Sequence, residues 1–234
     1  MKIALIQLKA EKGNVSHNIA NHISWIERVV MHNPDLIIFP ELSITGFEPT
    51  LAKELAFQES DKRFDVFQKY SDKMNCSISF GLPLKKTQGI QIAMLIFQPK
   101  IPRTFYSKQW LHEDEIQYFT PGTSQTILSV NDTCIAPAIC YESLNPSHLT
   151  NCLTLGTAIY LASVSKHDKG ISEAYKYYSK IASLNSMPVL VVNSVGYCDN
   201  FMSAGQSAVW DSKGNLVENL STDKEGFLLY DYMS

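Results

Sequence analysis

Short apolar segments of strand length alternate with segments of helical periodicity along this chain, and this alternation constrains the fold more than any other feature. Residues 2–8 (KIALIQL) have the length and composition of a strand. Apolar side chains then recur at helical spacing from residue 18 to residue 30, and Pro34 is expected to end that helix. Residues 35–40 (DLIIFP) predict a second strand, apolar enough for burial on both faces.

The alternation of predicted strands and helices continues along the rest of the chain. Strands are predicted at residues 77–84, 90–97, 103–108, 126–130, 134–140, 158–164 and 189–195, and helices at residues 62–74, 146–155 and 172–186. Residues 207–211 and 227–232 flank the turn SKGN and predict a hairpin. The order of elements favours a layered α/β protein. With 234 residues, 45% of them hydrophobic, we expect a single domain over residues 1–234.

Charge and cysteine usage exclude several classes of protein. The net charge is −3 and Lys85–Lys86 is the nearest approach to a basic cluster, so neither nucleic acid nor an anionic membrane is an expected partner. No apolar run reaches the roughly 20 residues of a membrane helix, and residues 3–8 are too short for a signal peptide, which predicts a cytoplasmic protein. The five cysteines are widely spaced and lack a C-x-x-C pair, so neither a disulfide framework nor a zinc site is expected.

Glu41 is the first candidate for chemistry, in the segment FPELSITGF at residues 39–47. This carboxylate directly follows a buried strand, and ligand sites of α/β sheets lie at strand ends. A carboxylate at the edge of an apolar core should have a raised pKa, as a general base needs. Alternatively, Glu41 could cap a helix that begins at Leu42.

Lys108 is the second candidate, in the segment FYSKQWLHEDE at residues 105–115. It follows a predicted strand, so its ammonium could reach a site at the strand end, and Glu115 lies seven residues further on. The alternative is a solvated lysine followed by an acidic loop.

Cys140 is the third candidate, in the segment APAICYESLNP at residues 136–146. It ends a strand where the chain must turn toward a helix, which is the geometry of a nucleophile elbow. In that geometry the backbone N–H of Tyr141 faces a developing oxyanion. The alternative is a buried, inert cysteine. Taken together, a thiol, a base and a cation are the groups that covalent attack on a carbonyl carbon requires.

These three segments, in this order, resemble the motifs of the nitrilase superfamily of carbon–nitrogen hydrolases, and the resemblance runs from residue 4 to about residue 216. FPELSITGF is similar to the glutamate motif, YSKQWL with the later YFTPG to the lysine motif, and AICYES to the cysteine motif. The resemblance implies an α-β-β-α sandwich that assembles as a homodimer or larger homo-oligomer. It also implies a Glu41–Lys108–Cys140 triad with Glu115 as an auxiliary carboxylate, and no metal or organic cofactor.

The activity that the resemblance implies is hydrolysis of a small linear carboxamide or N-carbamoyl C–N bond through a cysteine thioester. Phe47 could shape the pocket, and Lys166 or His167 could meet a substrate carboxylate. The run after the cysteine departs from many amidases at Leu144, Asn145 and Ser147, so no specific substrate is transferred. Nitrile hydrolysis, acyl transfer and a catalytically silent scaffold are the competing functions.

Overall fold

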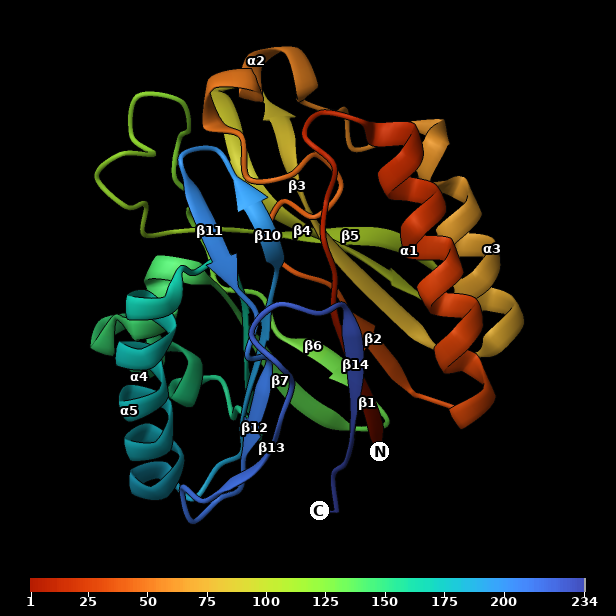
Figure 1. Cartoon of the computed structure of the whole chain (residues 1–234). Coiled ribbons are helices and arrows are strands. Elements are labelled where there is room, and N and C mark those ends of the chain that lie inside the picture. The colour runs from red at the N-terminus through yellow and green to blue at the C-terminus, as the bar shows by residue number, and fades with distance from the viewer. Residues whose placement is uncertain (234) are drawn as a thin grey trace.

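The computed structural model describes residues 1–233 and has four layers, with two six-stranded sheets packed face to face and helices outside both (Figure 1). The first sheet has the order β14 (Gly226–Asp231), β1 (Lys2–Gln7), β2 (Leu36–Ile38), β3 (Ser77–Lys86), β4 (Gly89–Gln98) and β5 (Ile101–Ser107). The second has the order β13 (Leu216–Asn219), β12 (Ala208–Trp210), β9 (Val189–Asn193), β8 (Ile159–Val164), β7 (Thr133–Ile139) and β6 (Leu128–Val130). This is the α-β-β-α sandwich that the motifs implied.

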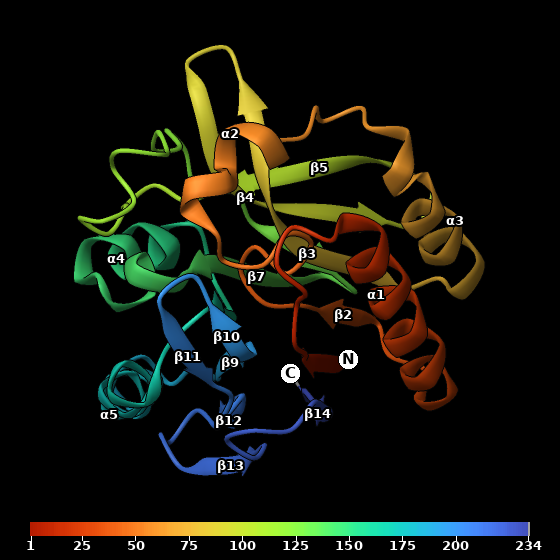
Figure 2. The same cartoon turned by 45° about the horizontal axis from the view of Figure 1, so that its top comes forward.

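Helices cover the outer face of each sheet. α1 (Val15–Val29) and α3 (Asp65–Met74) pack on the first sheet, whereas α4 (Pro146–Thr154) and α5 (Asp168–Asn185) lie on the second (Figure 1). The remaining pieces are α2 (Ala52–Leu55) and the 3₁₀ turns η1 (Val30–His32), η2 (Pro49–Leu51), η3 (Lys62–Phe64) and η4 (Cys140–Leu144). β10 (Val195–Cys198) and β11 (Phe201–Ala204) form a separate hairpin beside α5 (Figure 2).

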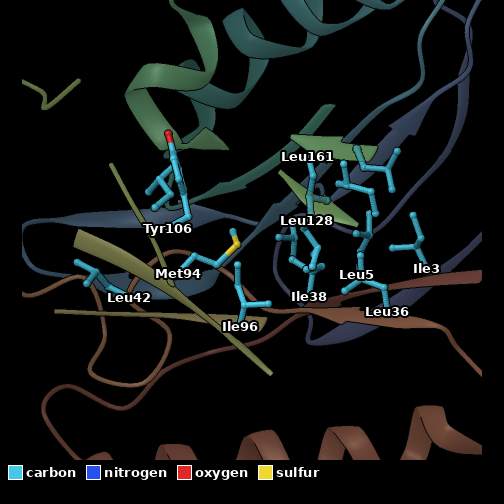
Figure 3. Packing of buried hydrophobic residues seen from close by; sticks show 14 of the residues in the cluster. Ile3, Leu5, Leu36, Ile38, Leu42, Met94, Ile96, Tyr106, Leu128 and Leu161 are labelled. Atoms are coloured by element: carbon cyan, nitrogen blue, oxygen red, sulfur yellow. The ribbon is translucent and has the colours of Figure 1, made fainter. Parts of the chain in front are cut away.

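The alternation of side chains along β1 explains the layering. Ile3 and Leu5 point into the core between the two sheets, whereas Ala4 and Ile6 face the helical layer. Successive strand residues point to opposite faces, so a strand that is apolar at every position can serve two cores at once. Figure 3 shows the core between the sheets, where Ile3 and Leu5 lie near residues of both sheets.

The predicted helices lie close to their observed positions, and their starts are set by caps that periodicity does not reveal. α1 begins at Val15 because the side chain of Asn14 accepts a hydrogen bond from the backbone N–H of His17. α5 begins at Asp168, since the His167 ring accepts from the backbone N–H of Gly170.

The predicted hairpin between residues 207–211 and 227–232 is wrong. β12 pairs instead with β13, and β14 crosses to the other sheet to pair antiparallel with β1. The pattern missed β13 because all four of its residues are exposed and it lacks the alternation of a half-buried strand. The chain therefore uses its last strand to tie the second half of the molecule to the first.

Candidate active site

Glu41 lies in a turn that follows β2, at the carboxyl end of this inner strand of the first sheet. Residues 41–45 form turns rather than a helix, so the helix-cap alternative for Glu41 is wrong. Leu42 has a positive φ of 50°, and the turn packs directly on β3. A Cβ on Gly81 of β3 would lie 2.2 Å from the backbone nitrogen of Leu42, so only glycine permits this approach. The local backbone thus fixes where the carboxylate emerges.

Lys108 follows β5 directly and is completely buried. Its Nζ donates to Oε1 of Glu41 at 2.8 Å and to Oε1 of Glu115 at 2.6 Å. The other oxygen of Glu115 accepts from the backbone N–H of His112 at 2.8 Å. The solvated-lysine alternative is therefore wrong, and three predicted residues from two segments meet in one buried cluster.

The charges in this cluster govern its proton affinities. Burial raises the pKa of Glu41, and the nearby Lys108 opposes that rise without cancelling it. Burial would lower the pKa of Lys108, but Glu41 and Glu115 outweigh it and hold the pKa above its ordinary value. The cluster therefore combines a permanently charged ammonium with a carboxylate of increased basicity.

Cys140 lies at the sharp turn that follows β7 and is partly buried. Its φ of 48° is in the left-handed region, which is rare for a residue with a side chain and frequent at functional turns. The thiol points toward the backbone oxygen of Ser165, with Sγ 3.7 Å from it. The sequence predicted a sharp strand-to-helix turn at Cys140, and the positive φ directly after β7 agrees with that prediction.

The thiol and Glu41 are close enough to affect each other. Burial and the charge of Glu41 raise the pKa of Cys140 to about 11, while Lys166 and Lys108 lower it. A hydrogen bond from Cys140 is in turn one of the influences that lower the pKa of Glu41. Oε2 of Glu41 has no hydrogen-bond partner among residues 1–233 and is a free acceptor. With its pKa raised to about 11, the thiol is protonated at rest.

A cavity of about 460 Å³ gives access to this cluster, and its lining includes Cys140, Glu115, Phe47, Tyr141, Lys166 and His167. Phe47 is nearly buried and packs on Phe201, with ring centres 5.7 Å apart. His167 is exposed at the rim, where it caps α5. A more open hollow of about 810 Å³ beside Lys100–Arg103 contains none of the candidate residues, so chemistry assigns the smaller cavity as the site.

The backbone N–H of Tyr141 lies in the first turn of η4, directly after the nucleophile candidate. The first N–H groups of a helical segment have no partner within it, so this donor is available beside the sulfur. Lys108 has a third N–H besides the two used by the carboxylates. Both groups are suitable donors for an oxyanion.

Glu142 is an important residue that sequence reasoning did not assign to the site. Its Oε1 accepts from the backbone N–H of Ile139 at 2.7 Å, and its Oε2 accepts from that of Gln109 at 2.6 Å. Burial raises its pKa to about 7, although hydrogen bonds from Tyr106, Ile139 and Gln109 oppose the rise. Glu142 thus joins the residue after Lys108 to the residue before Cys140. A glutamate two residues after the cysteine was the only signal for this role.

Within residues 1–233, no group of three or more His, Cys, Asp and Glu side chains is arranged to hold a metal ion. Over the same residues, none of the helices has the length and apolarity to span a bilayer.

The carbon–nitrogen hydrolase family model matches residues 2–232, and the chain belongs to this family. A probable nitrilase of Schizosaccharomyces pombe is 23% identical over 97% of this chain and 87% of its own length. A glutamine-dependent NAD(+) synthetase of Thermotoga maritima is 24% identical over 93% of this chain, which spans only 39% of that protein.

Solved structures share the fold over nearly the whole chain. A variant of the amidase from Nesterenkonia sp. AN1, with acrylamide added to its active-site cysteine, has a TM-score of 0.90 at 19% identity and covers 100% of this chain and 93% of its own. A CN-hydrolase superfamily protein of Xanthomonas campestris has a TM-score of 0.88 at 18% identity, over 98% of this chain and 89% of its own. The family match and the shared fold make this chain a carbon–nitrogen hydrolase.

Proposed function

We propose that this protein hydrolyses a small linear carboxamide, with Cys140 as nucleophile, Glu41 as general base and acid, and Lys108 as oxyanion donor. The observation that carries the proposal is the buried cluster in which Lys108 Nζ bonds both Glu41 and Glu115 beside a cavity lined by Cys140. The family match, the amidase with a shared fold and the glutamine-dependent synthetase relative support an amide over other substrates.

In the first half-reaction the Sγ–H proton of Cys140 moves to Oε2 of Glu41 as the sulfur bonds the amide carbon. Because the pKa of this thiol is raised to about 11, the proton leaves during attack rather than beforehand. The third N–H of Lys108 and the N–H of Tyr141 stabilise the oxyanion. Protonated Glu41 then gives its proton to the leaving nitrogen, the C–N bond breaks, and a thioester and ammonia result.

In the second half-reaction a water molecule attacks the thioester carbon and gives its proton to Glu41. The C–S bond then breaks, the carboxylic acid forms, and the sulfur recovers the proton from Glu41. Glu115 anchors the Lys108 ammonium throughout, because its other oxygen is held by the backbone N–H of His112. The proposed cycle uses the substrate, one water molecule and groups of this chain.

The test is ammonia release from a panel of small primary amides by the intact chain and by the Cys140→Ala variant. Deleting a covalent nucleophile should lower kcat by roughly 1,000-fold or more while the protein stays folded. Cys134→Ala is a matched control and should keep its activity, because Cys134 lies on β7, the strand that leads to Cys140, but does not line the cavity.

Intact-mass measurement during turnover should detect an acyl adduct on the wild type and none on Cys140→Ala. Near-normal ammonia release by Cys140→Ala, or an adduct that persists in it, would overturn the proposal. Hydrolysis of the corresponding nitriles in preference to the amides would correct the substrate class while leaving the nucleophile in place.

A further inference from the structure

Lys166 lines the candidate catalytic cavity, whereas Lys108 is completely buried behind it. Lys166 follows β8 by two residues and lines the same cavity as Cys140. Its neighbour Ser165 supplies the backbone oxygen that faces the Cys140 sulfur at 3.7 Å. Only 9% of Lys166 is exposed.

The backbone of Lys166 is fixed by its surroundings. Its N–H donates to Oδ1 of Asn193 at 2.8 Å, and its carbonyl accepts from Nδ2 of the same asparagine at 3.0 Å. The carbonyl also accepts from the backbone N–H of Ala204 at 2.9 Å. A side chain that starts from so rigid an anchor reaches a restricted part of the cavity, as a binding group should.

The Lys166 ammonium has no anionic partner in the part of the chain that the structure describes. Nζ takes part in none of the hydrogen bonds, and no carboxylate oxygen lies within 4.0 Å of it, whereas Lys108 bonds two carboxylates. Asp114 and Glu173 also line the cavity but are exposed and form no ion pair with it. Its Nζ is not among the buried side-chain atoms that lack a hydrogen-bond partner, so the ammonium reaches the solvent of the cavity and can bind an anion there.

An anion bound to Lys166 would come from the substrate, because Glu41 and Glu115 are already bonded to Lys108. The charge of Lys166 also reaches the thiol. Burial and Glu41 raise the pKa of Cys140, and Lys166 is the strongest of the influences that lower it. A group bound to Lys166 would therefore lie close to the reacting carbon.

We infer that Lys166 binds a carboxylate on the acyl part of the substrate, so that the preferred substrates are monoamides of short dicarboxylic acids. The inference rests on the proposed amide hydrolysis. When a primary amide loses ammonia, everything that remains is the acyl part, so the anion must be there. The cavity of about 460 Å³ accommodates an acyl chain of this size.

The test compares acids with their neutral isosteres, succinamate with succinamide and glutaramate with glutaramide. The wild type should have a kcat/KM roughly 10- to 100-fold higher for each acid, the range expected for one charge-assisted hydrogen bond. Lys166→Met should remove that preference by lowering kcat/KM for the acids alone, and Lys166→Arg should retain part of it. Lys169→Met is the matched control, since Lys169 is exposed and does not line the cavity.

A binding measurement separates this inference from the proposed function. Succinate and glutarate should bind the Cys140→Ala protein, as measured by calorimetry, and binding should weaken roughly 10-fold or more when Lys166→Met is added. Equal turnover of acids and diamides, or an equal loss on both in Lys166→Met, would overturn the carboxylate site and leave amide hydrolysis intact. If none of these amides is hydrolysed, the proposed function fails, and the titration still decides whether Lys166 binds carboxylates.

Discussion

The two halves of the molecule contribute side chains of different character to the same candidate site, the first half behind the cavity and the second half on its wall. The first sheet contributes Glu41 and Lys108, which are buried and bonded to each other. The second contributes Cys140 and Lys166, which line the cavity and form no ion pair with any of residues 1–233. Under the proposed mechanism, the acid–base groups already have their partners within the folded chain, whereas the nucleophile and the proposed binding group contact a ligand.

Among single substitutions at the site, Lys108→Met should have the largest effect on the buried cluster of the first half. It would leave Glu41 and Glu115 buried together without a counter-charge. We expect the free energy of unfolding to fall by about 3–5 kcal/mol and kcat to fall by roughly 100- to 1,000-fold because an oxyanion donor is lost. Urea denaturation and steady-state kinetics measure the two effects. Lys85→Met, at an exposed lysine of β3, is the control, and unchanged stability in Lys108→Met would mean that the pair is not holding the first half together.

The pH dependence of the free energy of unfolding can be assigned to each half separately, because each half contains one buried histidine. His22 of α1 bonds Ser43 and the backbone of Asn18, and His148 of α4 bonds Tyr160. Burial lowers the pKa of each ring to about 4, below the ordinary 6.5. The unfolded chain therefore binds more protons, and stability should fall by about 3 kcal/mol per histidine as the pH drops from 6.5 to 4.

The check is the free energy of unfolding at several pH values for His22→Gln and His148→Gln. In each variant, the fall in the free energy of unfolding between pH 6.5 and 4 should be smaller by about 3 kcal/mol, the contribution of one histidine. In the second half, Glu142 acts with the opposite sign, since its folded pKa of about 7 lies above the ordinary 4.5 and stability rises as the pH falls through that window. An unaltered slope in His22→Gln would contradict the assignment for the first half.

Glu142→Gln would loosen the connection between the halves. An amide nitrogen would replace one of the two oxygens that accept from Ile139 and Gln109, so at least one buried N–H would lose its acceptor. We expect a loss of about 2 kcal/mol in unfolding free energy and a drop of roughly 10-fold in kcat with little change in KM, because Lys108 shifts relative to Cys140. A change in KM alone would argue that Glu142 affects substrate binding rather than alignment.

Much of the fold was predictable from the sequence because strands buried on both faces are apolar throughout. Residues 35–40 and 189–195 gave strong signals for that reason, and both contain observed strands. β13 escaped prediction because its four residues are exposed. The partner of β14 escaped because strand pairing over more than 200 residues leaves no local pattern.

The candidate site was predictable as a set of residues but not as a geometry. Glu41, Lys108 and Glu115 meet as the motifs implied, although nothing local in the sequence brings residues 41 and 108 together. The bridging role of Glu142 depends on hydrogen bonds to backbone N–H groups of two segments, which residue identity alone does not reveal. That the Lys166 ammonium has no anionic partner within residues 1–233 likewise emerges only from three-dimensional packing.

The pairing of β14 with β1 has a consequence for how the chain acquires its structure. Residues 226–231 supply the edge partner of residues 2–7, and Gln7 further depends on carbonyls of Ser221 and Lys224. During synthesis, the backbone N–H and C=O groups on one edge of β1 have no strand partner until more than 200 further residues have left the ribosome. Closure of the sandwich is therefore a late, long-range event, and nascent chains arrested before residue 226 would carry a sheet edge open to association with other chains.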